Sequence, residues 1–249
     1  MGSQRLILVD GSGYIFRAFY ALPPMSREDG TPVNAVFGFT SMLLKLSEDM
    51  EGENILVVFD AARTTFRNAI YKEYKANRSE PPEELVPQFD LIKKATIAIG
   101  LKSLEVENYE ADDIIATYVK IAKKENIETL VISSDKDLMQ LIQDGVSLYD
   151  PMKNIKIGPE AVLEKFGVSP DKVIDVQALA GDSSDNVPGV PGIGVKTASQ
   201  LINEYGSLEK LLDNASSIKQ EKRRESLLNN AELAIVSKKL VSLFSNVPI

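Results

Sequence analysis

Short apolar runs alternate along the chain with longer segments that are apolar at helical spacing. Each run has five or six residues and stops at polar residues, which predicts buried strands at 5–9, 54–59, 101–106 and 128–132 and an edge pair at 146–149 and 154–157. Helices are expected at 14–20, 33–50, 83–99 and 109–125. The alternation predicts an α/β fold with a mostly parallel sheet flanked by helices.

After about residue 159 the pattern is helical only. Segments 159–166 and 170–180 begin with proline, which favours helix starts. The stretch 181–199 reads G-D-S-S-D-N-V-P-G-V-P-G-I-G-V-K-T-A-S and is typical of two helices joined by a glycine hairpin. Gly192 and Gly194 would leave backbone N–H groups free at the next helix N-terminus, beside Lys196 and Thr197, where a phosphate can bind. We therefore expect a core at 1–158 and a helical DNA-binding region at 159–249, with its hairpin at 186–199.

Residues 61–88 fit neither pattern, because they are rich in Arg, Lys, Tyr and Pro and poor in aliphatic side chains. We expect a basic helix at 65–77, broken by R-S-E-P-P at 78–82. Such a segment is typical of a functional lid or a mobile loop. Its cations could be solvated or could hold a phosphate-bearing substrate, and Tyr74 could stack on bases or pack. The cations are Arg63, Arg67, Lys72, Lys75 and Arg78.

Acidic residues follow the strands. Asp10, Asp60, Glu110 and Asp135 stand at or after the ends of four predicted strands, which meet at one edge of a parallel sheet. Crowded carboxylates next to a core repel one another and resist desolvation, so hard divalent cations with oxygen ligands are the natural compensation. The predicted metal cluster comprises Asp10, Asp60, Glu110, Asp112, Asp113, Asp135, Asp137, Asp182 and Asp185.

Each acid also has a local explanation without a metal. Asp10 with Gly11 could form only a turn, Ser134 with Asp137 fits a capping box, and Glu110 favours a helix N-terminus. If these local explanations were the whole reason for every acid, acids would stand at four successive strand ends only by coincidence. We therefore prefer the metal cluster.

Composition narrows the chemistry. The chain has no cysteine and no histidine, which excludes disulfides, thiolate or imidazole zinc sites and Ser-His triads, and favours a reducing, cytoplasmic compartment. The net charge of −8 argues against nucleic acid, but without the nine clustered acids the remainder is +1. No apolar run approaches the ~20 residues of a membrane span.

Six motifs together resemble the 5′-nuclease (5′→3′ exonuclease) domain of bacterial DNA polymerase I, in the flap-endonuclease superfamily, over almost the whole chain. They are L-V-D-G-S-G-Y-I-F-R-A-F-Y (8–20), V-F-D-A (58–61), E-Y-K-A-N-R (73–78), E-A-D-D-I-I-A-T (110–117), S-S-D-K-D (133–137) and G-D-S-S-D-N-V-P-G-V-P-G-I-G-V-K-T-A (181–198).

The resemblance implies a PIN-like core, a helical arch at about 61–88, a helix–hairpin–helix and two Mg²⁺ (or Mn²⁺) ions. It implies a first metal at Asp10, Asp60, Glu110 and Asp112, and a second at Asp135, Asp137 and Asp185, with Asp113 and Asp182 in support. It further implies that Lys75, Arg78 and Arg17 contact the scissile phosphate. Tyr74 would orient an unpaired 5′ end, and Lys196 and Thr197 would hold duplex DNA with a K⁺ ion at the hairpin.

The implied activity is hydrolysis of 5′ flaps and of nicked or gapped duplex DNA in replication and repair, near the nucleoid and beside a covalently linked polymerase domain. Two alternatives stay open: a PIN-type RNase, and a non-catalytic structure-specific DNA-binding module. The hairpin and basic arch argue against the first, and the complete acid set argues against the second.

Overall fold

A computed structural model describes residues 5–151 and 153–249, and these contain one six-stranded sheet in the order β3-β2-β1-β4-β5-β6. All neighbours pair in parallel except β5 and β6, so the predicted parallel sheet and edge pair are confirmed. The strands are β1 (Leu6–Asp10), β2 (Asn54–Val58), β3 (Lys102–Leu104), β4 (Thr129–Ile132), β5 (Val146–Asp150) and β6 (Ile155–Ile157).

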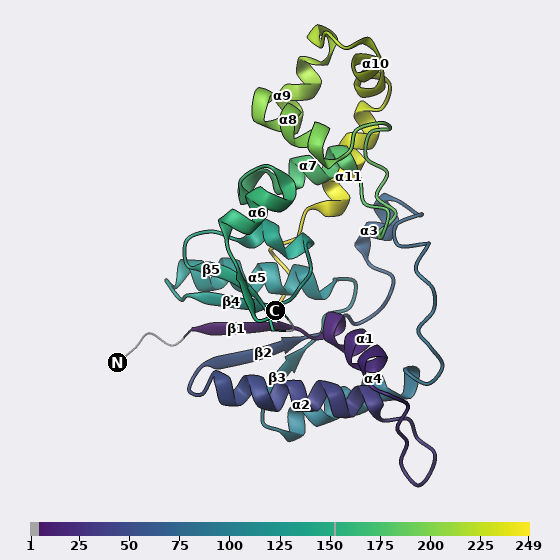
Figure 1. The fold of residues 1–249 in the computed structure, drawn as a ribbon, viewed down its shortest axis with the longest axis vertical. Coiled ribbons are helices and arrows are strands. Elements are labelled where there is room, and N and C mark those ends of the chain that lie inside the picture. Colours follow the sequence, from purple (N-terminus) through teal and green to yellow (C-terminus); the bar gives the residue numbers. More distant parts are fainter. Residues whose placement is uncertain (1–4, 152) are drawn as a thin grey trace.

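Side chains of β1 alternate between two apolar layers, as the period of a strand requires. Ile7 and Val9 pack with α1 (Gly11–Ala21), α2 (Asn34–Asp49) and α4 (Val86–Ala98) on one face. Leu8 packs with α5 (Ala111–Lys124) on the other face (Figure 1). The central strands are therefore buried on both faces, and their polar residues lie at the strand ends.

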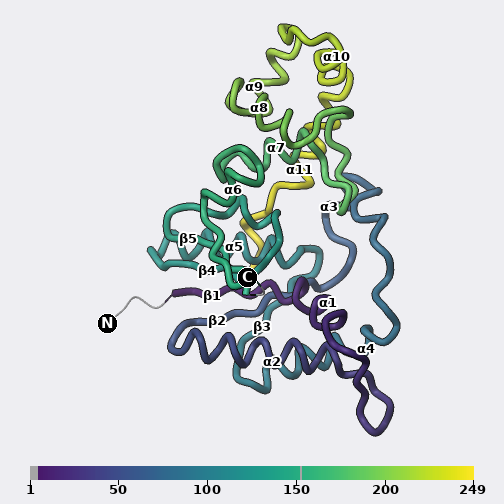
Figure 2. The backbone as a smooth tube through the Cα atoms, in the orientation of Figure 1, coloured from purple at the N-terminus to yellow at the C-terminus, as the bar shows by residue number. Residues whose placement is uncertain are grey.

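The helical region continues the core of the α5 face, because one apolar cluster includes Leu8, Ile114 and Val176. After α11 the chain runs back from the helices toward α5 and the sheet (Figure 2). No helix in the described ranges is long and apolar enough for a bilayer. The helices here are α6 (Pro159–Phe166), α7 (Val173–Ala180), α8 (Val195–Tyr205), α9 (Leu208–Asp213), α10 (Glu221–Asn229) and α11 (Ala231–Val241).

The basic segment is helical only over α3 (Phe66–Ile70), so the expected helix through residue 77 is wrong. The helix stops because Tyr71 has an extended backbone, with φ of −146° and ψ of 111°, and further along Lys75 adopts a left-handed backbone with φ of 54°. Its amide instead donates to the carbonyl of Asp185 at 2.9 Å. Contact with the loop before the hairpin has overridden the local preference for helix.

Candidate active site

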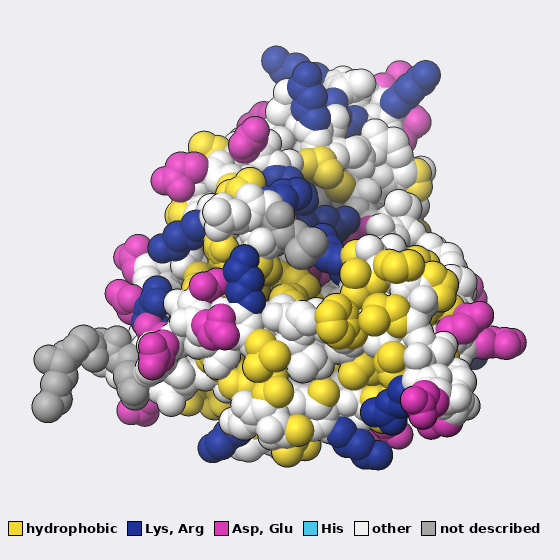
Figure 3. Space-filling view, turned by 60° about the horizontal axis from the view of Figure 1, so that its bottom comes forward, with side chains coloured by type: hydrophobic (Ala, Val, Ile, Leu, Met, Phe, Trp, Pro, Cys, Tyr) yellow, Lys and Arg dark blue, Asp and Glu magenta, His cyan; other side chains and the backbone are white. Residues whose placement is uncertain are grey.

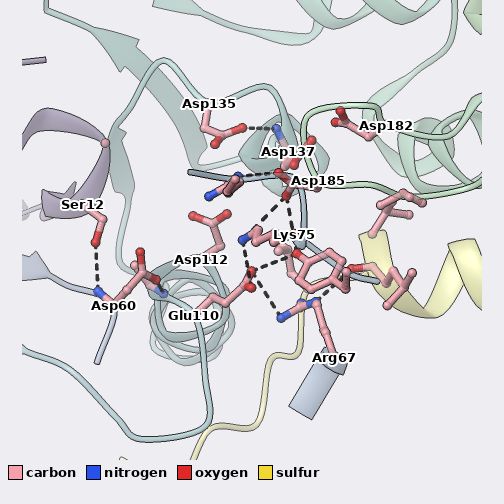
Figure 4. Close-up of a pocket in the computed structure, with 18 of the residues that line it drawn as sticks. Ser12, Asp60, Arg67, Lys75, Glu110, Asp112, Asp135, Asp137, Asp182 and Asp185 are labelled. Atoms are coloured by element: carbon pink, nitrogen blue, oxygen red, sulfur yellow. Dashed lines mark hydrogen bonds and ion pairs between the residues drawn. The ribbon is translucent and has the colours of Figure 1, made fainter. Parts of the chain in front are cut away.

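The acids converge on one pocket with a volume of about 150 Å³ at the carboxyl edge of the sheet (Figure 4). Eight of the nine predicted acids line it, and only Asp113 does not. The acids arrive from the ends of β1, β2 and β4, from the start of α5 and from the loop before the hairpin. The lining acids are Asp10, Asp60, Glu110, Asp112, Asp135, Asp137, Asp182 and Asp185.

A buried hydroxyl connects two of these strand ends. Ser133 donates to Asp10 Oδ2 at 2.8 Å and accepts from the amide of Asp135 at 3.0 Å. Asp10 also accepts from the amide of Gly13 at 3.1 Å, so it caps α1 while its other oxygen faces Ser133. The ends of β1 and β4 are therefore held at a fixed separation.

Capping roles and site roles coincide. Asp60 Oδ1 accepts from the amide of Ala111 at 2.7 Å, and Ser12 accepts from the amide of Asp60 at 2.9 Å. Glu110 is the N-cap of α5 and shares a capping box with Asp113. The alternative interpretation of Ser134 with Asp137 as a capping box does not hold, because Asp135 Oδ1 accepts from the amide of Asp137 at 2.8 Å.

Burial and mutual repulsion raise the pKa of several carboxyl groups. Burial, followed by the charges of Asp135 and Asp60, raises the pKa of Asp10 to about 6. Burial, followed by the charge of Asp135, raises the pKa of Asp137 to about 7. Burial and the charges of Asp135 and Asp10 raise the pKa of Asp112 well above its usual value. Ionised carboxylates in this pocket therefore need positive charge.

Basic side chains supply part of that charge. Lys75 Nζ lies 2.9 Å from Glu110 Oε1 and 3.6 Å from Asp185 Oδ2, and Arg78 pairs with Asp185 (Figure 4). Lys136 Nζ lies 2.5 Å from Asp182 Oδ2. Basic side chains gather in the middle of the face in Figure 3, whereas most visible acidic ones lie toward its rim. Three of the pocket acids, Glu110, Asp182 and Asp185, are thus paired with cations.

The donor set fits hard divalent cations, since most of its side-chain oxygen atoms belong to carboxylates, and burial together with mutual repulsion raises the pKa of Asp10 and Asp137. Within residues 5–151 and 153–249, however, no three acids have the positions of a ready metal site. Lys75 and Arg78 engage Glu110 and Asp185 instead. The carboxylates of Glu110 and Asp185 are therefore paired with arch cations in this structure.

Two predicted site residues, Arg67 and Asp113, pair with each other instead. Arg67 was expected to contact DNA, but its side chain is 1% exposed and forms a two-bond ion pair with Asp113, at 2.7 Å for each bond. Asp113 was expected among the metal ligands, but it is fully buried. Its oxygens also accept from the amides of Glu110 and Phe244, which leaves it no direct ligand role. Both expectations are corrected.

The other arch and phosphate-contact residues also have internal partners. Tyr74 is 5% exposed and its hydroxyl lies 3.2 Å from Glu110 Oε2, so it packs and presents no open ring face for stacking on a base. Arg17 does not line the pocket; it lies 3.7 Å from Asp150 and donates to Ser134. Arg63 pairs with Glu80 across the arch and stays exposed.

The hairpin is open to ligands. Gly192 has φ of 78°, and a side chain added at Gly192 or Gly194 would meet nothing within 4 Å. Gly194 caps α8, whose first turn carries the exposed Lys196 and the half-buried Thr197. The predicted phosphate-binding geometry, a glycine turn leading into an exposed helix N-terminus, is present.

Known proteins match this whole arrangement. Residues 5–167 match the 5′-3′ exonuclease, N-terminal resolvase-like domain, and residues 168–249 match the 5′-3′ exonuclease, C-terminal SAM fold. The chain belongs to the 5′–3′ exonuclease family. DNA polymerase I of Rhizobium leguminosarum is 54% identical over 254 residues, covering 99% of this chain and 25% of that protein. The chain thus spans about a quarter of that relative.

Solved structures share the fold. The T5 5′-exonuclease bound to zinc is 25% identical, with a TM-score of 0.82, covering 97% of this chain and 90% of that one. The bacteriophage T5 flap endonuclease in a pseudo-enzyme–product complex with DNA and metal ions is 24% identical, with a TM-score of 0.80 and the same coverage. The second likeness is at the level of fold.

Within this 5′–3′ exonuclease fold, three polar residues that sequence reasoning missed support the acids. Ser12 and Ser133 hold Asp60 and Asp10, and both stand beside predicted acids in the sequence, which could have signalled them. Gln177 Nε2 donates to Asp137 Oδ1 at 2.5 Å. Gln177 comes from α7, forty residues away, and nothing in the sequence signals that contact.

Proposed function

We propose that the chain is a divalent-metal-dependent 5′-nuclease that hydrolyses phosphodiester bonds of 5′ flaps and of nicked or gapped duplex DNA, in replication and repair. The observation that carries the proposal is the pocket of eight acids, which is also lined by the arch side chains Lys75 and Arg78 and by the loop that leads into the open glycine hairpin. The names of the relatives agree with it. A polymerase domain on the same polypeptide and a cytoplasmic, nucleoid-associated location belong to this proposal.

Two Mg²⁺ or Mn²⁺ ions are assigned to this pocket, where such ions would lower the pKa of water and stabilise charge on the leaving oxygen. Asp10, Asp60, Glu110 and Asp112 would hold one ion. Asp135, Asp137 and Asp185 would hold the other, and Asp182 would act through its contact with Lys136. Asp113 supports Glu110 without touching metal.

The residues of the chain have separate tasks in this proposal. Lys75 and Arg78 would leave Glu110 and Asp185 and donate to the scissile phosphate, offsetting the charge that builds on its oxygens. The N-terminus of α8 with Lys196 and Thr197 would bind a phosphate of the duplex, with K⁺ at the turn of Gly192 and Gly194. Arg63 would extend the basic surface of the arch.

Substrate choice tests the proposal directly. Wild-type protein is expected to cut a labelled 5′-flap DNA duplex in Mg²⁺, to lose activity in chelator, and to spare single-stranded RNA. Asp135→Ala should bind the flap and leave it uncut. Preferred RNA cleavage would favour the PIN-type RNase, and tight flap binding without cleavage by wild type would favour the binding module.

Lys75→Ala is expected to slow flap cleavage by about 10²-fold, because it removes a cation from the developing phosphate charge. Binding, measured in chelator by fluorescence anisotropy, should weaken far less. Lys72→Ala is the matched control, since Lys72 is an exposed lysine of the same segment outside the acidic pocket. Equal losses of cleavage and binding in Lys75→Ala would mean that Lys75 only holds DNA.

A further inference from the structure

We infer that Arg67 is a positioning residue for the acidic pocket, which acts through Asp113 on Glu110 and fastens the segment 242–247 to the site. The inference rests on the proposed function, because it concerns Glu110 as an expected metal ligand. The C-terminal segment 242–247 contributes no acid to the pocket, but under this inference it helps to build the acidic site. Its evidence is a set of contacts around one buried ion pair.

The donors of Arg67 are almost fully committed. A guanidinium has five N–H donors in a fixed fork. Its Nη1 and Nη2 each donate to Asp113 at 2.7 Å, Nε donates to the carbonyl of Leu240 at 2.8 Å, and Nη2 also donates to the carbonyl of Ser242 at 3.0 Å. One donor on Nη1 is left, and Nη1 lies 3.5 Å from Glu110 Oε2. The free donor is therefore the one beside the site.

The acceptors of Asp113 are committed in the same way. Besides Arg67, its Oδ2 accepts from the amide of Glu110 at 3.1 Å and its Oδ1 accepts from the amide of Phe244 at 2.8 Å. A carboxylate that caps the backbone of Glu110 fixes where α5 begins. The position of the Glu110 side chain therefore depends on a residue that does not line the pocket.

Three segments distant in sequence meet at this pair. Arg67 lies on α3 at the root of the arch, Asp113 lies in the first turn of α5, and Leu240 is on α11. The rings of Phe66, Tyr109 and Phe244 pack around it, with centroids 5.5 to 6.0 Å apart.

Further along the segment, the amide of Val247 donates to Thr117 Oγ1 at 3.1 Å. Residues 242–247 thus follow α5 away from the pocket. The arch root, the first turn of α5 and the residues around 240–244 all bond directly to Arg67 or Asp113, and the ring contacts and the bond of Val247 to Thr117 add to this junction.

The positioning role of Arg67 depends on the geometry of its guanidinium and not only on its positive charge. A lysine ammonium at position 67 would keep the charge but could not reach Asp113 twice and the two carbonyls together. A buried ion pair can also be replaced by apolar side chains of similar volume with little loss of stability. Stability and positioning can therefore be separated by choosing the replacement.

The test compares four proteins: wild type, the single variants Arg67→Met and Arg67→Lys, and the double variant that combines Arg67→Met with Asp113→Leu. The double variant should regain part of the thermal stability that Arg67→Met alone loses, because it removes the unpaired carboxylate of Asp113 but leaves the carbonyls of Leu240 and Ser242 and the amides of Glu110 and Phe244 without these partners. Its affinity for Mn²⁺ by calorimetry and its kcat on the flap should both stay about 10- to 100-fold below wild type, with KM little changed. Amide exchange over 242–247 should be faster. Arg67→Lys should not restore affinity.

A double variant with wild-type stability, Mn²⁺ affinity and kcat would overturn the inference, because the pair would then be only a packing element. Wild-type Mn²⁺ affinity and kcat in Arg67→Lys would show that the forked guanidinium is not needed. If the double variant does not fold, Asp113→Asn replaces it in the test, and an Mn²⁺ affinity equal to that of wild type in Asp113→Asn would also overturn the inference.

The control for the loss of an ion pair is the double variant Arg5→Met with Glu53→Leu, at the other end of the sheet. Absence of flap cleavage by wild type would refute the proposed function while metal affinity and exchange still test Arg67.

Discussion

Asp112→Asn is expected to abolish cleavage and, in chelator, to raise the unfolding temperature. Burial and the charges of Asp135 and Asp10 raise the pKa of Asp112, so its ionised form is destabilised in the folded protein. The neutral amide has nearly the same shape and removes that repulsion. It is also a poorer ligand for a hard cation, and we expect kcat/KM to fall by at least about 10²- to 10³-fold, as when a group that stabilises transition-state charge is lost.

The opposite directions of the two effects make this result diagnostic. Cleavage is measured on the 5′-flap duplex at saturating Mg²⁺, and unfolding is followed by circular dichroism in chelator. Asp90→Asn, at an exposed position of α4 that does not line the pocket, is the control and should change neither. Unchanged cleavage by Asp112→Asn would show that Asp112 is not a metal ligand. A lower unfolding temperature would show that repulsion at Asp112 does not destabilise the folded protein.

The convergence of the acids could be predicted from the sequence because it follows from topology. Strand-length apolar runs that alternate with helices give parallel strands, whose carboxyl ends share one edge. Asp10 and Asp60 follow such runs directly, Asp135 follows one after two serines, and all three line the pocket. A capping role does not prevent an acid from lining the pocket, because Asp10 and Asp60 accept hydrogen bonds from helix N-terminal amides and still face the pocket.

The burial of Arg67 could not be predicted, because local sequence makes it one of several cations in a polar segment. Its partners at 240 and 242 lie more than 170 residues along the chain, and only tertiary packing brings them together. The same holds for the missing helix after Ile70. Lys75 gives up helical geometry for a backbone hydrogen bond to Asp185, a contact at a sequence separation of 110 residues.

In chelator the protein is expected to lose stability as pH rises from about 5 to about 7, and the decline should level off above pH 7, where both Asp10 and Asp137 are ionised in the folded protein. The pKa of Asp10 is raised to about 6 and that of Asp137 to about 7, mainly by burial, from an ordinary value of 3.8. The folded state therefore binds more protons than the unfolded state in this window, so stability falls as pH rises through it. At about 1.4 kcal/mol for each pKa unit, the loss is on the order of 2–4 kcal/mol.

Among the other groups, Asp112 acts in the same direction, because its pKa is also raised well above the ordinary value. The chain has no histidine, so no side chain with an ordinary pKa titrates there. Hydrogen bonds and nearby cations lower the pKa of Asp29, Glu53, Asp182 and Glu209, and the stability that these acids contribute is lost only at lower pH. Divalent ions favour ionised carboxylates, so added Mg²⁺ should stabilise the protein more at pH 8 than at pH 5.

Thermal unfolding from pH 4.5 to 8.5, with chelator and with Mg²⁺, measures both slopes. Asp137→Asn should flatten the decline in chelator, because it removes the carboxyl group with the higher of the two pKa values, about 7. The exposed control Asp90→Asn should leave the decline unchanged. A stability that rises with pH in chelator would mean that arch cations such as Lys75 already compensate the acids, and that the pocket has no need of a metal for its charge.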